Sequence, residues 1–369
     1  MRSKTMSEFD SVEDVADKIK ENLNSNSNSN KKKISVIYAF NGTGKTRLSN
    51  EFIKLDEENE LTNNKVLCYN AFLEDLFKWD NEQCILFFDS NSWESKLIGD
   101  EGLESKIIDN FQTILNTKIE PSFNLKTGEI TFYFPSDNDR TNIKISSGEE
   151  SMFIWSVFYT ILETAIDELN ISEESYRSTN LFNELEYVII DDPVSSIDDT
   201  KLITQAIELI KLIKLDGKNS LKFLVTTHHA LFYNIFFNSF GRDGKFKSYP
   251  YILSKKETKL KLEKQKNDSP FGYHLLIKDE IKKAIDSGNI QKYHFNLFRS
   301  LLEKTANFLG YNNWYDCITG DKKQEITKIV NLYSHSKLVE MEYKELSDES
   351  KDLFKTTFNN FIRDYNWKV

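Results

Sequence analysis

Residues 34–46 constrain the fold more than any other stretch of the chain. They read Ile-Ser-Val-Ile-Tyr-Ala-Phe-Asn-Gly-Thr-Gly-Lys-Thr, so an apolar, β-branched run passes abruptly into a glycine-containing turn. The stretch from Arg47 to Leu55 that follows is compatible with a helix. A strand, a glycine loop and a helix in this order form the context of a phosphate-binding P-loop. The sequence therefore predicts an α/β domain that binds a nucleotide at this loop.

Each position of the loop has a chemical task. Gly42 and Gly44 allow backbone N–H groups to turn inward around phosphate oxygens, and the next helix points its positive end at the same anion. We expect Lys45 to reach the β- and γ-phosphates and the Thr46 hydroxyl to ligate Mg²⁺. Ala39 stands where the first glycine of the motif usually lies, and alanine is small enough for the close approach. The predicted nucleotide-binding residues of the loop are Asn41, Gly42, Thr43, Gly44, Lys45 and Thr46.

Length and composition limit the class of protein. A chain of 369 residues predicts one large or two medium domains, and 39% hydrophobic residues are enough for a sizeable core. The sequence shows no N-terminal signal segment and no apolar run of transmembrane length, which argues against a fused transporter and predicts no membrane partner. Cys68, Cys84 and Cys317 have no CxxC spacing, and such reduced thiols are typical of a cytoplasmic protein.

Further polar residues follow two buried-type strands later in the chain. Residues 187–192 read Tyr-Val-Ile-Ile-Asp-Asp, a strand that ends in two carboxylates. Asp191 is suited to holding Mg²⁺, and Asp192 is placed to orient or deprotonate an attacking water. The apolar strand over 222–225 leads to His228, which can contact a γ-phosphate, although a lone histidine is more often structural.

Residues 145–149, Ile-Ser-Ser-Gly-Glu, open directly into an apolar helix. Taken alone they indicate a helix N-cap. Together with the P-loop, the strand ending at Asp191, the loop 195–198 and His228, they resemble the ABC ATPase family in the order of its motifs. The resemblance implies a head-to-tail dimer, in which the signature of one chain lies over the P-loop of the other. The further nucleotide-binding residues that it implies are Ser146, Gly148, Glu149, Asp198 and His228.

The hydrolytic residue departs from the usual ABC pattern. Asp192 stands where most relatives carry glutamate, which predicts slow or conditional hydrolysis. The sequence does not choose between ATP and GTP.

The C-terminal part has a different character. Residues 267–270, Asn-Asp-Ser-Pro, break the chain, and the pattern is helical from Tyr273 onward. We therefore predict an ABC-type α/β ATPase domain over residues 1–265 and a smaller, mainly α-helical domain over residues 266–369. The apolar spacing also predicts an amphipathic helix over 1–23, a short strand over 142–145 and a hairpin over 247–264.

Lysines gather in this hairpin and just after it. They can contact the phosphate backbone of a nucleic acid, or they form an ordinary solvated face. The candidates are Lys259, Lys261, Lys264 and Lys266. Asp268, a hydrogen-bond acceptor in the turn ahead of the C-terminal helices, is a candidate for reading a base.

Arg299 and Glu303 are four residues apart on a predicted helix, so their side chains lie on one face, and His335 follows 32 residues later. A surface ion pair and an unrelated histidine give the same spacing. With the ATPase motifs, however, this set resembles the nuclease triad of the PrrC-type anticodon nucleases. The stretches that are similar to that family span nearly the whole chain, and they are 38–49, 148–159, 190–199, 293–295 and 308–311.

Arginine, glutamate and histidine suit metal-independent RNA cleavage, in which the 2′-OH attacks the adjacent phosphate and leaves 2′,3′-cyclic phosphate and 5′-OH ends. We expect either Glu303 or His335 to be the base and the other the acid, with Arg299 offsetting the charge on the phosphate. His294, about one turn ahead of Arg299, is the reserve acid. The resemblance implies that the substrate is tRNA, typically a lysine tRNA, cut in the anticodon loop. It also implies a homo-oligomer, anti-phage defence, silencing by a type I restriction–modification complex, and gating by the ATPase domain.

Two other classes stay open at this point. An ABC ATPase that acts on DNA would need a metal-binding nuclease cluster, which the sequence does not show. A nucleotide-switched binding module would have an inert C-terminal domain. Convergence of Arg299, Glu303 and His335 in space would favour the nuclease over the binding module.

Overall fold

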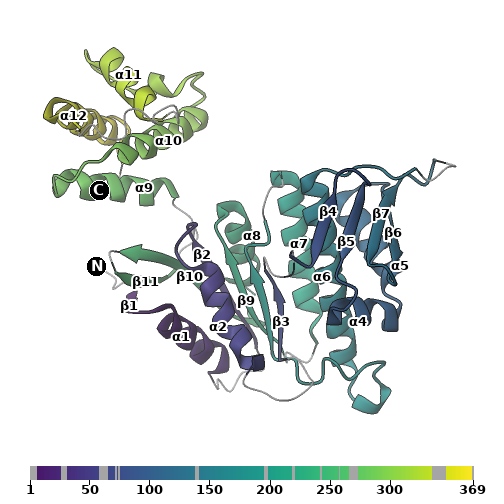
Figure 1. Ribbon diagram of the computed structural model, residues 1–369. Coiled ribbons are helices and arrows are strands. Elements are labelled where there is room, and N and C mark those ends of the chain that lie inside the picture. Colours follow the sequence, from purple (N-terminus) through teal and green to yellow (C-terminus); the bar gives the residue numbers. More distant parts are fainter. Residues whose placement is uncertain are drawn as a thin grey trace. The chain divides into compact units, whose positions relative to one another are not determined.

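The computed structural model describes residues 6–25, 31–57, 65–70, 73, 75–137, 141–194, 198–217, 221–241, 243–256, 258–265, 273–334 and 346–367. The chain folds into two compact units, Met1–Pro270 and Phe271–Val369, which are described separately (Figure 1). The first unit is α/β and the second is mainly α-helical, so the predicted fold class is confirmed.

One large sheet organises the first unit. In the described part of the chain, seven strands follow the order β1-β11-β10-β2-β9-β8-β3. From β10 to β3 neighbouring strands are parallel, whereas β11 and β1 form an antiparallel edge. The strands are β1 (Met6–Phe9), β2 (Lys32–Ala39), β3 (Val66–Tyr69), β8 (Tyr187–Asp191), β9 (Lys222–Thr227), β10 (Phe246–Lys256) and β11 (Lys259–Lys264). Because β2, β9 and β8 are parallel neighbours, the loops that follow them meet at one edge of the sheet.

Helices cover both faces of this sheet. On one face α1 (Val12–Asn24) and α2 (Lys45–Glu57) share an apolar core with Ile37 and Ala39 of β2. On the other face α8 (Ala230–Gly241) brings the ring of Tyr233 to 6.0 Å from that of Tyr38. Successive side chains of a strand point to opposite faces, so a strand covered on both sides must be apolar throughout. The run in β2 that precedes the P-loop meets this requirement except at the buried Ser35, whose hydroxyl donates to the Tyr249 carbonyl (3.3 Å).

A second, smaller sheet supports the long helix α6 (Ser147–Asn170). Its strand order is β4-β5-β7-β6 in the described residues. The buried ring of Phe153 in α6 lies 5.1 Å from Phe132 of the sheet and 5.5 Å from Phe111 of α5. The elements of this part are β4 (Phe77–Asp80), β5 (Ile85–Phe88), α4 (Trp93–Glu101), α5 (Glu104–Leu115), β6 (Glu120–Asn124) and β7 (Glu129–Tyr133). α7 (Asp199–Leu215) follows β8 along the chain.

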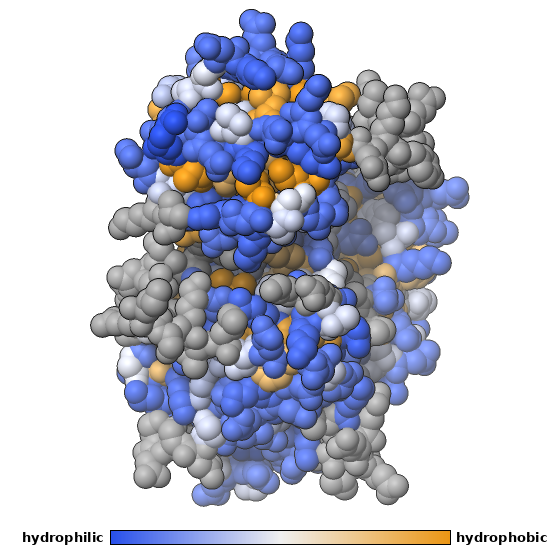
Figure 2. Space-filling model, turned by 90° about the vertical axis from the view of Figure 1, so that its left-hand side faces the viewer, coloured by the Kyte–Doolittle hydropathy of each residue, from blue (hydrophilic) through white to orange (hydrophobic). Residues whose placement is uncertain are grey.

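The second unit is built from helices around an aromatic core. Phe298 and Phe354 are buried, with ring centroids 5.5 Å apart. The described helices are α9 (Tyr273–Asp286), α10 (Lys292–Leu309), α11 (Lys323–Ser334) and α12 (Asp348–Asp364), with a 3-10 turn at Trp314–Cys317. One side chain of this unit, Phe308, is 90% exposed although it is apolar. On the face of the molecule drawn in Figure 2, apolar residues, in orange, lie among hydrophilic ones. None of the described helices combines the length and the apolar character that crossing a membrane requires.

Two local expectations are wrong. Residues 6–9 form β1, which pairs with β11, so the N-terminal helix starts only at Val12, behind the capping box of Ser11 and Asp14. Residues 142–145 do not form a strand: Ile143 N–H donates to the Phe132 carbonyl (2.8 Å), and the chain then turns into α6. Phe9 packs against the apolar core of the first unit and Ile145 is buried, so the apolar pattern of each stretch reflects packing and not the predicted element.

Candidate nucleotide site and candidate nuclease cluster

The P-loop has the backbone geometry that its glycines predict. Gly42 and Gly44 have φ angles of +78° and +107°, in the left-handed region that glycine adopts without strain. Thr43 N–H closes the turn by donating to the Phe40 carbonyl (3.2 Å), and α2 begins at Lys45. The loop therefore places the positive end of α2 at the edge where β2, β9 and β8 end.

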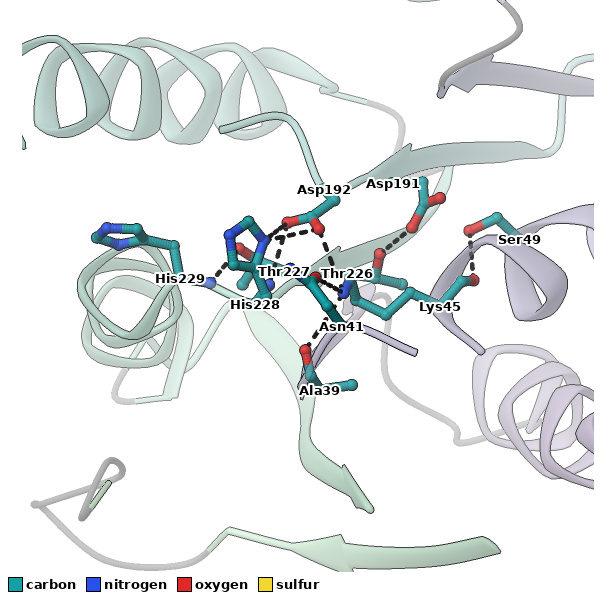
Figure 3. Close-up of polar contacts among 10 residues, drawn as sticks. All are labelled: Ala39, Asn41, Lys45, Ser49, Asp191, Asp192, Thr226, Thr227, His228 and His229. Carbon is teal, nitrogen blue, oxygen red and sulfur yellow. Dashed lines mark hydrogen bonds and ion pairs between the residues drawn. The ribbon is translucent and has the colours of Figure 1, made fainter. Parts of the chain in front are cut away.

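Lys45 is held at the centre of this edge, as Figure 3 shows. Its side chain is only 7% exposed, and its Nζ lies 3.0 Å from Asn41 Oδ1 and 3.4 Å from the Ala39 carbonyl oxygen. The same Nζ lies 3.2 Å from Asp192 Oδ2. A buried ammonium requires such oxygen partners, and a phosphate oxygen can replace any of them. The contacts thus keep Lys45 where a bound phosphate would meet it.

Asp191, at the end of β8, is buried and accepts a hydrogen bond from the Thr226 hydroxyl of β9. Burial raises the pKa of its carboxyl group, while hydrogen bonds with Thr226 and Thr46 oppose that rise. Carboxylate and hydroxyl oxygens are the ligands that Mg²⁺ prefers, and a cation here would offset the cost of a buried charge. The donor set of Asp191 and Thr46 therefore fits the predicted Mg²⁺.

Asp192 adopts a left-handed backbone conformation with φ of +52°. Its backbone N–H donates to the Thr226 carbonyl (3.0 Å), and its Oδ1 accepts from the backbone N–H of His228 (3.0 Å). His228 Nδ1 lies 2.7 Å from the same carboxylate. An ionised carboxylate only accepts, so Nδ1 carries the proton and the ring presents Nε2 to other partners. Asp192 thus links Lys45 to His228 within one chain.

The remaining predicted nucleotide-binding residues lie at helix starts. Ser146 and Glu149 form a capping box at α6, with Ser146 N–H donating to Glu149 Oε2 at 2.7 Å, and Gly148 lies in the first turn. Asp198 caps α7 and accepts from Lys201 N–H and Thr200 N–H, which lowers the pKa of its carboxyl group. Among the described residues, no hydrogen bond or ion pair joins either cap to Lys45.

In the second unit, three elements meet at Arg299 of α10. Its Nε donates to Glu303 Oε1 (2.8 Å), one helical turn further on. Its Nη1 donates to Asn331 Oδ1 (3.1 Å) from α11, and its Cζ lies 5.4 Å from the ring centroid of Trp314. Sequence reasoning found Arg299 and Glu303 but missed Asn331 and Trp314. The one available signal was that Asn331 precedes His335 by four positions, a helical spacing.

Several predicted site residues lie outside the described residues. They are His335, Lys266, Asp268 and the stretch 195–197 of the predicted loop. The structure brings Arg299 and Glu303 together, while the roles assigned to His335 and Asp268 stay predictions.

The predicted hairpin of β10 and β11 is present, but strand alternation divides its lysines. Leu260 and Leu262 face the core, so Lys264 lies on their face and Lys259 and Lys261 lie on the other. Lys259 Nζ is 3.5 Å from Asp10, Lys261 Nζ is 3.9 Å from Glu263, and Lys264 Nζ is 5.4 Å from the Tyr249 ring centroid. These lysines therefore do not form one continuous surface.

Known proteins place the chain in a family. No protein-family model matches it. It is 41% identical over 363 residues to an anticodon nuclease of Escherichia coli, a similarity that covers 91% of this chain and 90% of the relative. Among solved structures it is similar to the SMC head domain from Thermotoga maritima, with 12% identity, a TM-score of 0.29, and coverage of 61% of this chain and 88% of that chain. The first similarity extends over nearly the full length of both sequences, and this chain belongs to the anticodon nuclease family.

Proposed function

We propose that this chain is a nucleotide-gated ribonuclease that cuts tRNA in the anticodon loop. The observation that carries the proposal is the 41% identity to an anticodon nuclease over 91% of the chain. This relationship also makes the chain an enzyme and sets aside the DNA-acting ATPase and the inert binding module. The predicted domain roles apply to the two units: nucleotide binding in the first and RNA cleavage in the second.

The geometry at Arg299 supports a particular chemistry. The RNA 2′-oxygen attacks the adjacent phosphorus as a base removes its proton. The bond to the 5′-oxygen breaks as an acid supplies a proton there, which leaves a 2′,3′-cyclic phosphate and a 5′-OH. Negative charge builds on the phosphate oxygens, where a guanidinium stabilises it. Glu303, bonded to Arg299 and 44% exposed, is the base and His335 the acid, or the two exchange roles.

The nucleotide part works through Lys45 and Asp192. ATP or GTP binds with its phosphates on the P-loop. The phosphates then compete with the Asp192 carboxylate for the Lys45 ammonium, and the ion pair between Lys45 and Asp192 breaks. Asp192 is then available to orient water, and its partner His228 faces the phosphate. Thr46 and Asp191 would hold Mg²⁺, which neutralises phosphate charge when bound. This exchange of partners is the first step of the proposed gate.

The exposed helix caps support the proposed assembly. Ser146 and Asp198 are exposed at the starts of α6 and α7, where a second chain can reach them. In the proposed head-to-tail dimer, Ser146, Gly148 and Glu149 of one chain, with Asp198, complete the P-loop site of the other. The same proposal assigns a lysine tRNA as substrate, a cytoplasmic role in anti-phage defence, and silencing by a type I restriction–modification complex.

Incubation of the full chain with total tRNA, followed by mapping of both new ends, tests the proposal. We expect one dominant cut in the anticodon loop of a lysine tRNA, with 2′,3′-cyclic phosphate and 5′-OH ends. A matched tRNA with a 2′-deoxy nucleotide at the cut should resist cleavage, because it lacks the nucleophile. Cleavage of that substrate, or 5′-phosphate ends, would overturn the mechanism; absence of any tRNA cut would overturn the function.

A further inference from the structure

A phosphate-gripping arginine must be held in place. The arginine side chain carries about 2 kcal/mol of rotamer entropy, and misplacement of a catalytic group by about 1 Å can cost roughly 10²-fold in rate. Glu303 alone fixes only the Nε side of the guanidinium. The rest of the group must be oriented by other partners.

Asn331 provides one of these partners from a different helix. Its Oδ1 accepts from Arg299 Nη1 at 3.1 Å, and Asn331 is half-buried on α11. The Nε and Nη1 bonds run to different helices, so together they fix the rotation of the guanidinium plane. The Asn331 bond also ties Arg299 to the helix that leads, along the chain, to His335.

Trp314 provides the second partner. The guanidinium carbon lies 5.4 Å from its ring centroid, within the range of a cation–π contact, and tryptophan is the strongest partner for such a contact. The indole is half-buried and packs against the core of the second unit, so it is a rigid surface. Arg299 itself is 20% exposed, which keeps part of its side chain accessible.

We propose that Asn331 and Trp314 are positioning residues that hold the Arg299 guanidinium in its phosphate-binding orientation. This inference rests on the proposed nuclease function and adds two residues to it. Neither residue donates or removes a proton in the reaction. Their effect passes through Arg299, and this dependence separates the proposal from a purely structural tie between α10 and α11.

Single-turnover cleavage of the tRNA substrate by full-length variants tests it. Asn331→Ala should lower the cleavage rate about 10- to 100-fold with little change in tRNA affinity, and Trp314→Leu should lower it roughly 2- to 30-fold. Asn331→Asp keeps an accepting oxygen and Trp314→Phe keeps a ring face, so each should recover most of the lost rate. Asn359, an exposed asparagine of α12, gives the control variant Asn359→Ala, which should cleave normally.

The decisive comparison is a double-mutant cycle with Arg299→Ala. If Asn331 and Trp314 act through Arg299, their variants should cause no further loss in that background, whereas a structural role would add its full cost. Additive losses would overturn the inference. So would full activity of Asn331→Ala and Trp314→Leu beside an inactive Arg299→Ala. Wild-type cleavage by Arg299→Ala would instead remove Arg299 from the nuclease active site, and absence of tRNA cleavage by the unmodified chain would overturn the proposed function, so the failures are distinguishable.

Discussion

The two sites of this chain are assembled in different ways. At the nucleotide site, Lys45, Asp192 and His228 follow three neighbouring parallel strands, so the sheet order alone brings them to one edge. At the nuclease cluster, Arg299 meets Glu303 through helical spacing but meets Asn331 only because α10 and α11 pack together. The first arrangement is fixed by topology, and the second depends on how loops and helices pack.

This difference has a functional consequence. A site at the edge of a sheet changes by exchanging partners, and in the proposed function Lys45 leaves Asp192 for a phosphate. A site between helices changes when the helices shift, because each contributes a contact to the same group. In the proposed nucleotide-dependent gate, the nucleotide site would therefore be the rigid part and the helical cluster the adaptable part, and variants in the two sites should fail in separable ways.

Loss of the P-loop lysine should give the largest effect. Lys45→Ala removes the charge that meets the phosphates, so nucleotide hydrolysis should be abolished. Asp192→Asn should still bind nucleotide but should not hydrolyse it. A steady-state phosphate-release assay would measure hydrolysis by both variants, and a parallel titration would measure their nucleotide binding. Normal hydrolysis by Asp192→Asn would remove that residue from the catalytic role.

The nuclease residues should fail without affecting hydrolysis. Removal of an acid or base typically costs roughly 10²–10⁴-fold, so Glu303→Gln and His335→Ala should each lose tRNA cleavage to that extent. Arg299→Lys should fail as well, because lysine keeps the charge but loses the planar fork that grips two oxygens. Cleavage and phosphate release measured on the same preparations would separate the sites. Wild-type cleavage by all three variants would rule out this active site.

The same contrast explains what sequence alone could predict. The P-loop, the carboxylates at the end of β8 and His228 were predictable because each belongs to a local motif in which an apolar strand ends in polar residues. Asn331 and Trp314 were not, because their contact with Arg299 depends on packing between segments with no shared periodicity. Residues 6–9 read as part of a helix because Phe9 fits a helical stripe, yet pairing with β11 decided their structure. The lysines of β11 are close together in sequence, but strand alternation places them on two different faces of the sheet.

Mixed dimers should give an intermediate effect. If Ser146 and Gly148 complete the partner's site, a Lys45→Ala chain paired with a Gly148→Asp chain has one intact site. Random pairing at equal amounts should restore about a quarter of the wild-type sites, since half of the dimers are mixed and each has one good site. Lys45→Ala mixed with Asp192→Asn is the matched control and should restore nothing, because both changes disable the P-loop side. Equal activity of the two mixtures would contradict the shared site.

The smallest effect concerns stability and again contrasts the sites. Burial raises the pKa of Asp191 above its ordinary value of 3.8, so the folded state holds the proton more tightly than the unfolded state. A group of this kind contributes stability below its unfolded pKa and loses that contribution as the pH rises through its folded pKa. Asp191→Asn keeps an oxygen that accepts from Thr226 but carries no charge. Its Tm without Mg²⁺ and nucleotide should therefore exceed that of the wild type at pH 7, and by more than at pH 5.

Glu303→Gln is the matched control. Glu303 is 44% exposed, so removing its charge should relieve little of the desolvation cost that a buried carboxylate carries. Thermal melts of the full chain at both pH values would measure the two differences. Mg²⁺ with nucleotide should raise the Tm of the wild type more than that of Asp191→Asn, since only the carboxylate holds the cation strongly. A lower Tm for Asp191→Asn at pH 7 would show that the ionised carboxylate is stabilising without metal. The buried Asp191 carboxylate would then carry no net electrostatic cost without metal, and relief of that cost could not favour cation binding at this site.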